Sequence, residues 1–309
     1  MTRVALLVNP AAGGGAGRRR APALARALSR AGASAELLET RGPGDARRIV
    51  EECRRAAVDV IAVAGGDGTL NEACQAYLDR DGQPVAGPPL ALLPIGTGGD
   101  FRRTIGAAED LDRAVERVLS AEPRAFDLGV LRLTTLAGAT DVRAFLNIAS
   151  FGLAGLTDRI VNTGPKWLGG RAAFYLATVR ALATWRNPLV RVRVDGVPWL
   201  ESPVVNVMIA NGRYFGGGMM IAPEADPADG RFDVVAIGDL GRLRTLGLTR
   251  AVYAGTHLTR RQITATRGIA VEAHAAVASD VVLIDMDGET PGRLPLSATV
   301  APGAIWIRV

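Results

Sequence analysis

The densest group of residues that could do chemistry is Gly65-Gly66-Asp67-Gly68-Thr69, which continues into Leu70, Asn71 and Glu72. An apolar run typical of a buried strand, residues 58–63, precedes it, and sequence typical of a helix start follows. A strand, a glycine turn and a helix together present bare backbone N–H groups and a helix N-terminus to an anion. Because glycine has no Cβ, the backbone can also approach a phosphate closely. The pattern predicts a phosphate-binding loop, with a tight turn capped by Asp67 as the alternative.

Asp67 carries negative charge, so it cannot attract a phosphate by itself. A carboxylate inside a phosphate loop indicates a Mg²⁺ partner or a part in proton transfer. The chain has a single lysine, Lys166, far from this loop. Any cation that touches phosphate in the first half of the chain must therefore be an arginine or a metal ion.

Two further glycine-rich segments follow expected strands. Asn9-Pro10 leads into Gly13-Gly14-Gly15 after an expected strand at 4–8, and Gly-Thr-Gly-Gly-Asp-Phe at 96–101 follows an expected strand at 90–93. For the first segment a flexible surface turn is the alternative. Thr40 ends another expected strand, at 35–39. Four strands alternating with helices predict a wound parallel α/β layer, whose ligands collect at the carboxyl ends of the strands.

The residue pattern changes after 121–123, where short alternating runs replace the strand–helix alternation. The sequence therefore predicts an α/β domain at 1–122 and an all-β domain, a sandwich or barrel, at 123–309. One helix is expected inside the second domain, at 172–185. Aromatic and basic residues from Lys166 to Arg186 could meet a membrane surface, and a helix packed on the sandwich with a solvated basic edge is the alternative.

Two acidic segments of the second half could also do chemistry. Asp226 and Asp229 lie in a loop shaped by proline and glycine, where oxygen ligands suit a hard cation, although an acidic turn is the simpler interpretation. Asp287-Gly288-Glu289 ends an expected strand. An alcohol that accepts a phosphoryl group needs a carboxylate within hydrogen-bond reach, and Glu289 could serve, although an exposed turn is the alternative.

Composition narrows the class of protein. The chain has 309 residues, 48% hydrophobic and 22% charged, with a net charge of +5. Cys53 and Cys74 are too few for a disulfide framework or a zinc site. Neither a signal peptide nor a spanning apolar segment is expected, which favours a cytoplasmic protein that is soluble or peripheral to the membrane. The basic balance favours a partner with negative charge, either nucleic acid or an anionic membrane.

The glycine loop at 65–69, with Asn71-Glu72, resembles the nucleotide loop of the diacylglycerol kinase catalytic-domain family, which includes bacterial lipid kinases and the sphingosine and ceramide kinases. NAD kinases and phosphofructokinases have a similar loop, but they lack the late Asp287-Gly288-Glu289. The Asn9 segment, the 96–101 segment and the Asp229-Gly230 segment also resemble motifs of the family. One departure is Gly99, which stands where the family usually has asparagine.

The resemblance implies a NAD-kinase-like fold for the first domain and assigns roles residue by residue. Glu289 and Asp67 would be catalytic, with Glu289 as the base. The metal site would hold Mg²⁺ through Asp226, Asp229 and the backbone carbonyl of Arg231. The nucleotide would be bound by residues of the glycine loops and their neighbours, namely Asn9, Thr40, Gly65, Gly66, Asp67, Gly68, Thr69, Leu70, Asn71 and Thr97.

The resemblance implies an ATP- and Mg²⁺-dependent kinase of a membrane lipid, with chemistry between the nucleotide domain and the lipid-substrate domain. Diacylglycerol or ceramide is favoured over sphingosine, because Leu156 is apolar where sphingoid-base kinases tend to have an acid and Asp158 is the first acid after it. The expected partner is the anionic inner face of the membrane rather than nucleic acid, and a homodimer is left open. The alternatives are a NAD-kinase-like enzyme of a soluble substrate and a non-catalytic lipid- or nucleotide-sensing protein.

Overall fold

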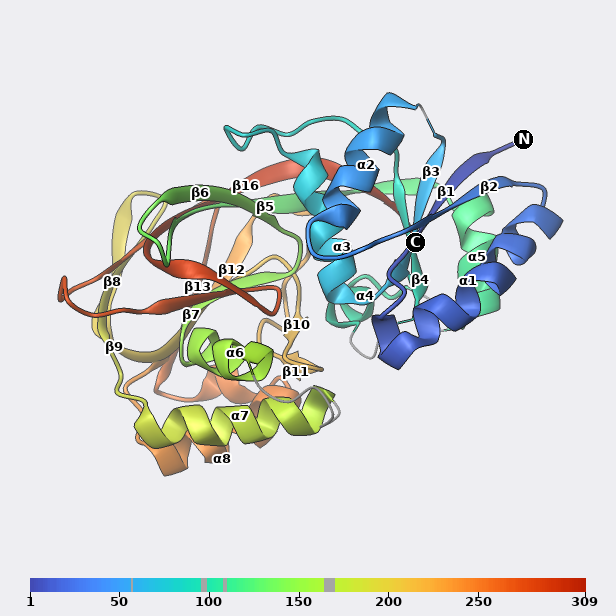
Figure 1. Ribbon diagram of the computed structural model, residues 1–309. Helices are drawn as coiled ribbons and strands as arrows, with labels where there is room; N and C mark the ends of the chain where they lie inside the picture. The colour runs from blue at the N-terminus through green and yellow to red at the C-terminus, as the bar shows by residue number, and fades with distance from the viewer. Residues whose placement is uncertain (57, 96–98, 108–109, 164–169) are drawn as a thin grey trace. The chain divides into compact units, whose positions relative to one another are not determined.

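The structure is a computed structural model that describes residues 1–56, 58–95, 99–107, 110–163 and 170–309 (Figure 1). The chain divides into two compact units. Unit 1 consists of Met1–Leu128 together with Ala301–Val309, and unit 2 consists of Gly129–Val300. Two strands therefore run from one unit into the other, β5 (Pro123–Thr135) and β16 (Glu289–Arg308).

Unit 1 contains a parallel sheet in the order β2-β1-β3-β4-β16. Its central strands are almost continuously apolar, as expected for parallel strands covered on both faces. Helices α1 and α5 cover one face, where Leu24, Leu28 and Val118 pack against β1 and β3. The strands are β1 (Arg3–Val8), β2 (Ser34–Glu39), β3 (Val60–Gly65) and β4 (Leu90–Pro94). The helices are α1 (Ala12–Arg30), α2 (Asp45–Arg55), α3 (Asp67–Cys74), η1 (Gln75–Tyr77), α4 (Asp100–Thr104) and α5 (Leu111–Ser120).

The last residues of β16 complete this sheet, which differs from the division at 122/123 expected from the sequence. Ile307 and Arg308 lie beside Leu90 and Ala91 of β4. The guanidinium of Arg308 donates to the carbonyls of Val118 and Leu119 at the end of α5, both at 2.9 Å. Alternation of apolar residues marked 305–309 as a strand but gave no sign of which sheet it would join.

In unit 2 the antiparallel pairs close a circuit. From β7 the hydrogen-bonded order runs β7-β9-β8-β14-β16-β15 and returns to β7. The inner side chains form one apolar core, in which the rings of Phe145 and Phe232 stack with centroids 5.4 Å apart. The strands are β6 (Thr140–Phe145), β7 (Ile148–Gly152), β8 (Leu189–Val194), β9 (Val197–Ala210), β10 (Tyr214–Phe215), β11 (Met219–Met220), β12 (Phe232–Gly238), β13 (Ile263–Gly268), β14 (Ala270–Ala275) and β15 (Leu283–Met286).

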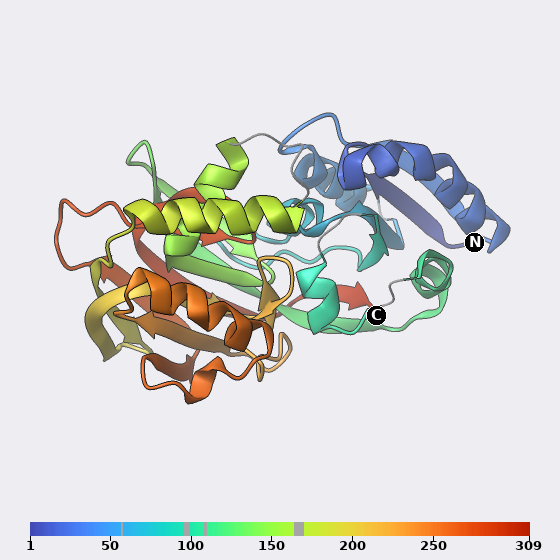
Figure 2. The same cartoon turned by 90° about the horizontal axis from the view of Figure 1, so that it is seen from below.

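Unit 2 also carries helices, so "all-β" was too narrow a prediction. They are α6 (Leu153–Thr163), α7 (Gly170–Thr184), α8 (Arg242–Tyr253) and the short η2 (His257–Thr259). Figure 2 shows α7 and α8 beside each other on one side of the strands. Helix α8 was not predicted from the sequence, because its buried residues, Leu248 and Val252, are few and arginines lie around them. No helix in the described ranges has the length and apolar character needed to cross a membrane.

Two glycines inside helices of unit 2 should respond oppositely to substitution. A Cβ on Gly155 of α6 would lie 2.6 Å from the carbonyl oxygen of Leu283 in β15, so Gly155→Ala must push the helix off the strand and should destabilise the fold by about 1–3 kcal/mol. Gly247 of α8 has open space around it, so Gly247→Ala should stabilise the fold by about 0.5–1 kcal/mol. Calorimetric melting of both variants checks this. Equal shifts would contradict the close packing of α6 on β15.

Candidate functional site

The predicted phosphate loop is a very short connection in unit 1. β3 ends at Gly65 and α3 begins at Asp67, so Gly66 alone makes the turn. A Cβ on Gly65 would lie 2.6 Å from the side chain of Thr69, which explains why a glycine is required there. Gly68 is exposed, with nothing near its missing Cβ. The first turn of α3 therefore offers bare backbone at the end of a parallel strand.

The loop after β1 is bound to this turn through Asn9. Its amide Nδ2 donates to Thr69 Oγ1 at 3.0 Å, and its backbone N–H donates to the Ala64 carbonyl at 3.1 Å. The Asn9 Oδ1 atom accepts the N–H of Ala11 at 3.0 Å, which fixes the direction of the loop. Asn9 and Thr69, predicted separately from two motifs, are therefore brought into contact.

Glu72 binds the segment between β2 and α2. Its carboxylate accepts the backbone N–H of Gly44, a residue with φ of 87° that starts α2. Thr40 lies at the end of β2, where its N–H donates to the Val8 carbonyl at 2.9 Å. Asn71 is buried and accepts a hydrogen bond from Gln75, so it supports α3 from inside the unit.

Asp67 binds the loop after β4. Its Oδ2 accepts the N–H of Gly99 at 2.6 Å and that of Asp100 at 3.1 Å, at the start of α4. The carboxylate for which the sequence indicated Mg²⁺ or proton chemistry therefore joins two glycine loops. Gly99 has φ of 118°, a conformation that favours glycine, which accounts for its presence where the family usually has asparagine. The predicted site residue Thr97 lies outside the described residues.

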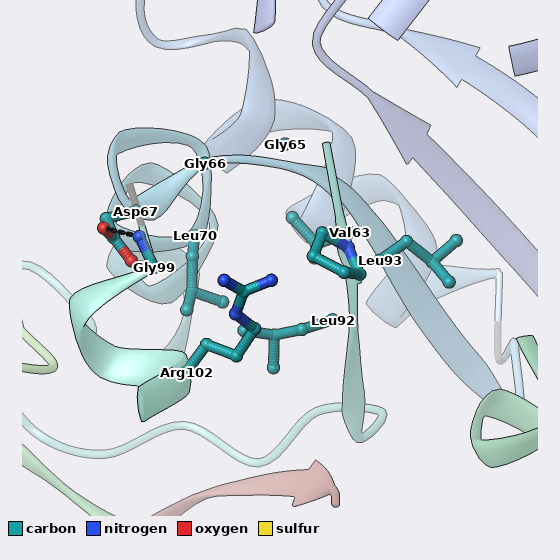
Figure 3. A pocket seen from close by; sticks show the side chains of 10 residues that line it. Val63, Gly65, Gly66, Asp67, Leu70, Leu92, Leu93, Gly99 and Arg102 are labelled. Carbon is teal, nitrogen blue, oxygen red and sulfur yellow. Dashed lines mark hydrogen bonds between the residues drawn. The ribbon is translucent and has the colours of Figure 1, made fainter. Parts of the chain in front are cut away.

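These loops surround a small hollow, which Figure 3 shows with the side chain of Arg102 reaching in from α4. Gly65, Gly66, Asp67 and Leu70 line it from the side of α3. Arg102 was not predicted as a site residue, although the near absence of lysine indicated that an arginine or a metal ion would have to meet phosphate. Its position in the first turn after a glycine loop was the available signal.

In unit 2, Asp287 and Gly288 form the two-residue turn between β15 and β16. Both have positive φ, 49° and 88°, and Met286 pairs with Glu289, as in a type I′ hairpin. The Asp287 carboxylate accepts three backbone N–H groups from the β6–β7 connection, at 2.8–3.4 Å. These bonds occupy the carboxylate, so Asp287 anchors the turn.

Glu289 is the carboxylate of this turn that remains accessible. Its side chain is 48% exposed, and its Oε2 lies 3.2 Å from Nη2 of Arg143 on β6. Arg143 also lies 3.7 Å from the Asp141 carboxylate. The hairpin thus presents a carboxylate oriented by one guanidinium, which suits the predicted role of a base.

The acidic loop predicted to bind Mg²⁺ is held by other partners. Asp229 forms an ion pair with Arg267, and its Oδ1 accepts the N–H of Arg231 at 3.0 Å. Asp226 accepts the N–H of Ala228 at 3.1 Å. Arg267 also reaches Asp233, and burial raises the pKa of that carboxyl. As arranged, these residues do not fit a metal ion, because a guanidinium already neutralises Asp229; the magnesium site stays a prediction.

A larger hollow lies among α6, α7, α8 and the β9–β12 strands of unit 2. It opens to solvent, and its space, including that open part, is about 860 Å³. Its walls are mainly aliphatic, aromatic and methionine side chains, and the polar side chains among them are uncharged, namely Thr157, Thr178, Asn206, Thr245, Thr249 and Tyr253. The apolar ones include Leu153, Leu182, Met208, Phe215, Met219, Ile237, Leu246 and Val252. Such a hollow suits a hydrocarbon chain and offers little to a charged soluble ligand. No local sequence pattern indicates this hollow, because its lining comes from separate segments.

Two family models match the chain. The diacylglycerol kinase catalytic domain matches residues 3–131, and the YegS C-terminal NAD kinase beta sandwich-like domain matches residues 147–309. The prediction of an α/β domain followed by a β-sandwich-like domain is confirmed at this level.

Relatives agree over nearly the whole chain. A diacylglycerol kinase of Mycobacterium tuberculosis is 26% identical over 99% of this chain and 94% of its own length. A protein of Stenotrophomonas maltophilia named probable lipid kinase YegS-like is 30% identical over 89% of this chain and 86% of its own. A crystal structure of a diacylglycerol kinase from Bacillus anthracis, 23% identical, has the same fold, with a TM-score of 0.71 over 99% of this chain and 96% of that one. The chain therefore belongs to the diacylglycerol kinase catalytic-domain family of lipid kinases.

Proposed function

We propose that this protein is an ATP-dependent lipid kinase that phosphorylates a hydroxyl of a diacylglycerol-like or ceramide-like lipid. The observation that carries the proposal is the apolar hollow of unit 2, in a chain whose other unit gathers glycine loops around the start of α3. The names of the relatives support a lipid acceptor in general. The hollow favours a lipid over the soluble substrate of a NAD-kinase-like enzyme, because its walls would leave a dinucleotide's phosphates and ribose hydroxyls unpaired.

The division of labour follows from each unit's own residues. In unit 1, backbone N–H groups at the start of α3 and the Arg102 guanidinium would hold the phosphates of ATP, taken with its Mg²⁺ as the substrate. In unit 2, Glu289 would accept the proton of the acceptor hydroxyl, with Arg143 holding the carboxylate in place. Because the transferred group carries its own reactivity, positioning and charge neutralisation supply most of the rate.

The activity is tested by incubating the protein with γ-labelled ATP and vesicles that contain diacylglycerol, ceramide or monoacylglycerol. Label in a chloroform-extractable product is the expected result. Label in NADP from added NAD would support the soluble-substrate alternative. Nucleotide binding without transfer to any of these acceptors would leave the protein a sensor and refute the proposal.

Replacing Glu289 by glutamine keeps the shape of the side chain and removes the proton acceptor. We expect turnover to fall by about 10²–10⁴, the usual contribution of a general base, with the affinity for ATP unchanged. Glu201→Gln is the matched control, because Glu201 also pairs with an arginine, Arg191, at 2.9 Å on the same unit. Turnover of Glu289→Gln above about a tenth of the control, with chemistry rate-limiting, would end the base assignment.

Filling the apolar hollow should separate lipid binding from nucleotide binding. Thr249 of α8 lines the hollow, and Thr249→Trp would occupy space that an acyl chain needs, whereas Thr249→Val keeps the size. The tryptophan variant should raise KM for long-chain diacylglycerol at least tenfold and leave KM for ATP unchanged. Short-chain diacylglycerol should be affected less. An equal loss for short and long chains would place the acyl chains elsewhere.

We also propose that α7 and α8 face an anionic membrane, at the inner face in the cell. Leu243 of α8 is 85% exposed between Arg242 and Arg244, and Leu176 of α7 is 55% exposed. Both helices line the apolar hollow, so this surface lies where a lipid would enter it. Exposed aliphatic side chains beside arginines suit the boundary between headgroups and acyl chains. Lys166 and Trp167, predicted to contribute, lie outside the described residues.

Arg242→Gln with Arg244→Gln should weaken sedimentation with phosphatidylserine vesicles by about 10–30-fold, since each surface arginine contributes about 1 kcal/mol to such binding. Arg26→Gln with Arg30→Gln removes the same charge from the exposed side of α1 and serves as the control. Binding to neutral vesicles should be weak for all forms. Equal weakening by the two pairs would mean that total charge, and not this surface, drives binding.

A further inference from the structure

Two aspartates are buried together in unit 2, behind the turn that carries Glu289. Asp285 of β15 is 4% exposed and Asp158 of α6 is 6% exposed. Asp285 lies opposite Ser150 of β7 in the strand register, and the Ser150 hydroxyl donates to its Oδ2 at 3.0 Å. The other oxygen, Oδ1, accepts the N–H of Gly288 at 3.0 Å. Asp285 thus binds the backbone of the turn that leads into Glu289, whereas Asp287 binds that turn to the connection between β6 and β7.

Asp158 and Asp285 are both buried where α6 packs on β15, close enough for their carboxyls to share a hydrogen bond. Two carboxylates can only accept, so this bond exists only when one of them carries a proton. Burial raises the pKa of Asp158, and the neighbouring charge of Asp285 raises it further. Asp285 has Ser150 and Gly288 to stabilise its charge. Asp158 is therefore the neutral partner that donates, and Asp285 is the anion that accepts.

No positively charged side chain neutralises the pair in place of this proton, among the residues that the structure describes. In the described part of the chain, the pKa of Asp158 is set by burial and Asp285, and that of Asp285 by burial and its three hydrogen-bond donors, without a contribution from an arginine. Among the residues whose side chains the structure describes, the charged ones on the parts of these elements nearest the pair are Arg143, Arg159, Arg180, Glu201, Asp287, Glu289 and Arg293.

Helix α6 connects this pair to the apolar hollow. Gly155 brings the helix against β15, and Thr290, the residue after Glu289, donates its hydroxyl to the Gly155 carbonyl at 3.4 Å. Leu153 and Thr157 of the same helix line the hollow. A shift of α6 would therefore change the lining of the hollow, and through Asp158 it would also change the β15–β16 turn.

We propose that Asp158 and Asp285 share one proton and act as a positioning pair, which fixes the Asp287-Gly288 turn to α6 and thereby sets where Glu289 points. The role in catalysis rests on the function proposed above, whereas the shared proton does not. Neither aspartate is proposed to touch a substrate. The pair instead makes the geometry of the base depend on the helix that contacts the acyl chain.

The shared proton is tested by stability alone. An aspartate has a pKa of about 3.9 when unfolded, so above that pH the folded protein binds one proton that the unfolded chain has lost. The contribution of the pair to the free energy of unfolding of the wild type therefore falls as pH rises from about 4 to the raised pKa of Asp158, and stays constant above it. Asp158→Asn keeps an N–H donor for Asp285 but has no proton to lose. Relative to wild type, its unfolding constant should fall by up to about tenfold per pH unit over that window.

Asp280→Asn, in a loop of the same unit, is the control and should leave the pH dependence of melting unchanged. Asp158→Asn should also lose an infrared band of a neutral carboxylic acid that the wild type shows at pH 6. A difference between Asp158→Asn and wild type that is constant from pH 4 to 9, without loss of that band, would overturn the shared proton.

The positioning role is tested by turnover. Asp158→Ala removes the donor and leaves Asp285 alone, so kcat should fall by 10–100-fold with KM for ATP unchanged. The kcat of Asp158→Asn should be at least tenfold higher than that of Asp158→Ala. If Asp158→Ala does not fold, the pH profiles of kcat are compared instead. The kcat of wild type should fall at alkaline pH, where the pair loses its proton, and the kcat of Asp158→Asn should not fall there. Turnover of Asp158→Ala equal to wild type, or identical alkaline limbs, would refute positioning. Absence of lipid phosphorylation by the wild type would refute the proposed function and leave the stability result intact.

Discussion

Three side chains of the short helix α3 accept hydrogen bonds from three neighbouring loops of unit 1 and hold these loops in place. Thr69 accepts from Asn9 of the loop after β1, Glu72 accepts from Gly44 before α2, and Asp67 accepts from Gly99 after β4. Glycine-rich loops bury little apolar surface, so these bonds must supply most of their order. A buried N–H that loses its partner costs about 1–3 kcal/mol. The start of α3 is thus the point to which the neighbouring loops are attached, and it is also the helix end at which we propose that phosphate binds.

Unit 2 uses carboxylates in the same way. Asp287 accepts three backbone N–H groups, and Asp285 accepts one more beneath the same turn. Glu289 differs because its partner is a side chain and its carboxylate is half exposed. The distinction between acids that accept backbone N–H groups and the acid that faces solvent supports the proposed chemical role of Glu289, whereas composition alone treats all of them as acidic residues in a turn.

The sequence predicted the features that depend on neighbours along the chain. Glycine turns after apolar strands located the loops around Gly65 and Gly99, and Asp287-Gly288-Glu289 located the end of a strand. Features that join distant segments could not be predicted. Asp67 meets a loop that begins 32 residues later, and Arg267, the partner of Asp229, lies 38 residues beyond it. The apolar hollow draws one or a few residues from each of several elements, so no local pattern marked it. Nucleotide contacts carried over from the family remain predictions.

The return of β16 to unit 1 has a consequence for synthesis on the ribosome. β4 lacks one neighbour, and the end of α5 lacks its arginine, until residues 301–309 have left the exit tunnel. Unit 2, in which the first part of β16 pairs with β14 and β15, must be made before the sheet that carries the glycine loops has its full width. Unit 1, although it begins the chain, therefore completes its sheet only after unit 2 has been synthesised. A nascent chain contains every residue of its apolar hollow before it contains the last strand of the sheet beside the glycine loops.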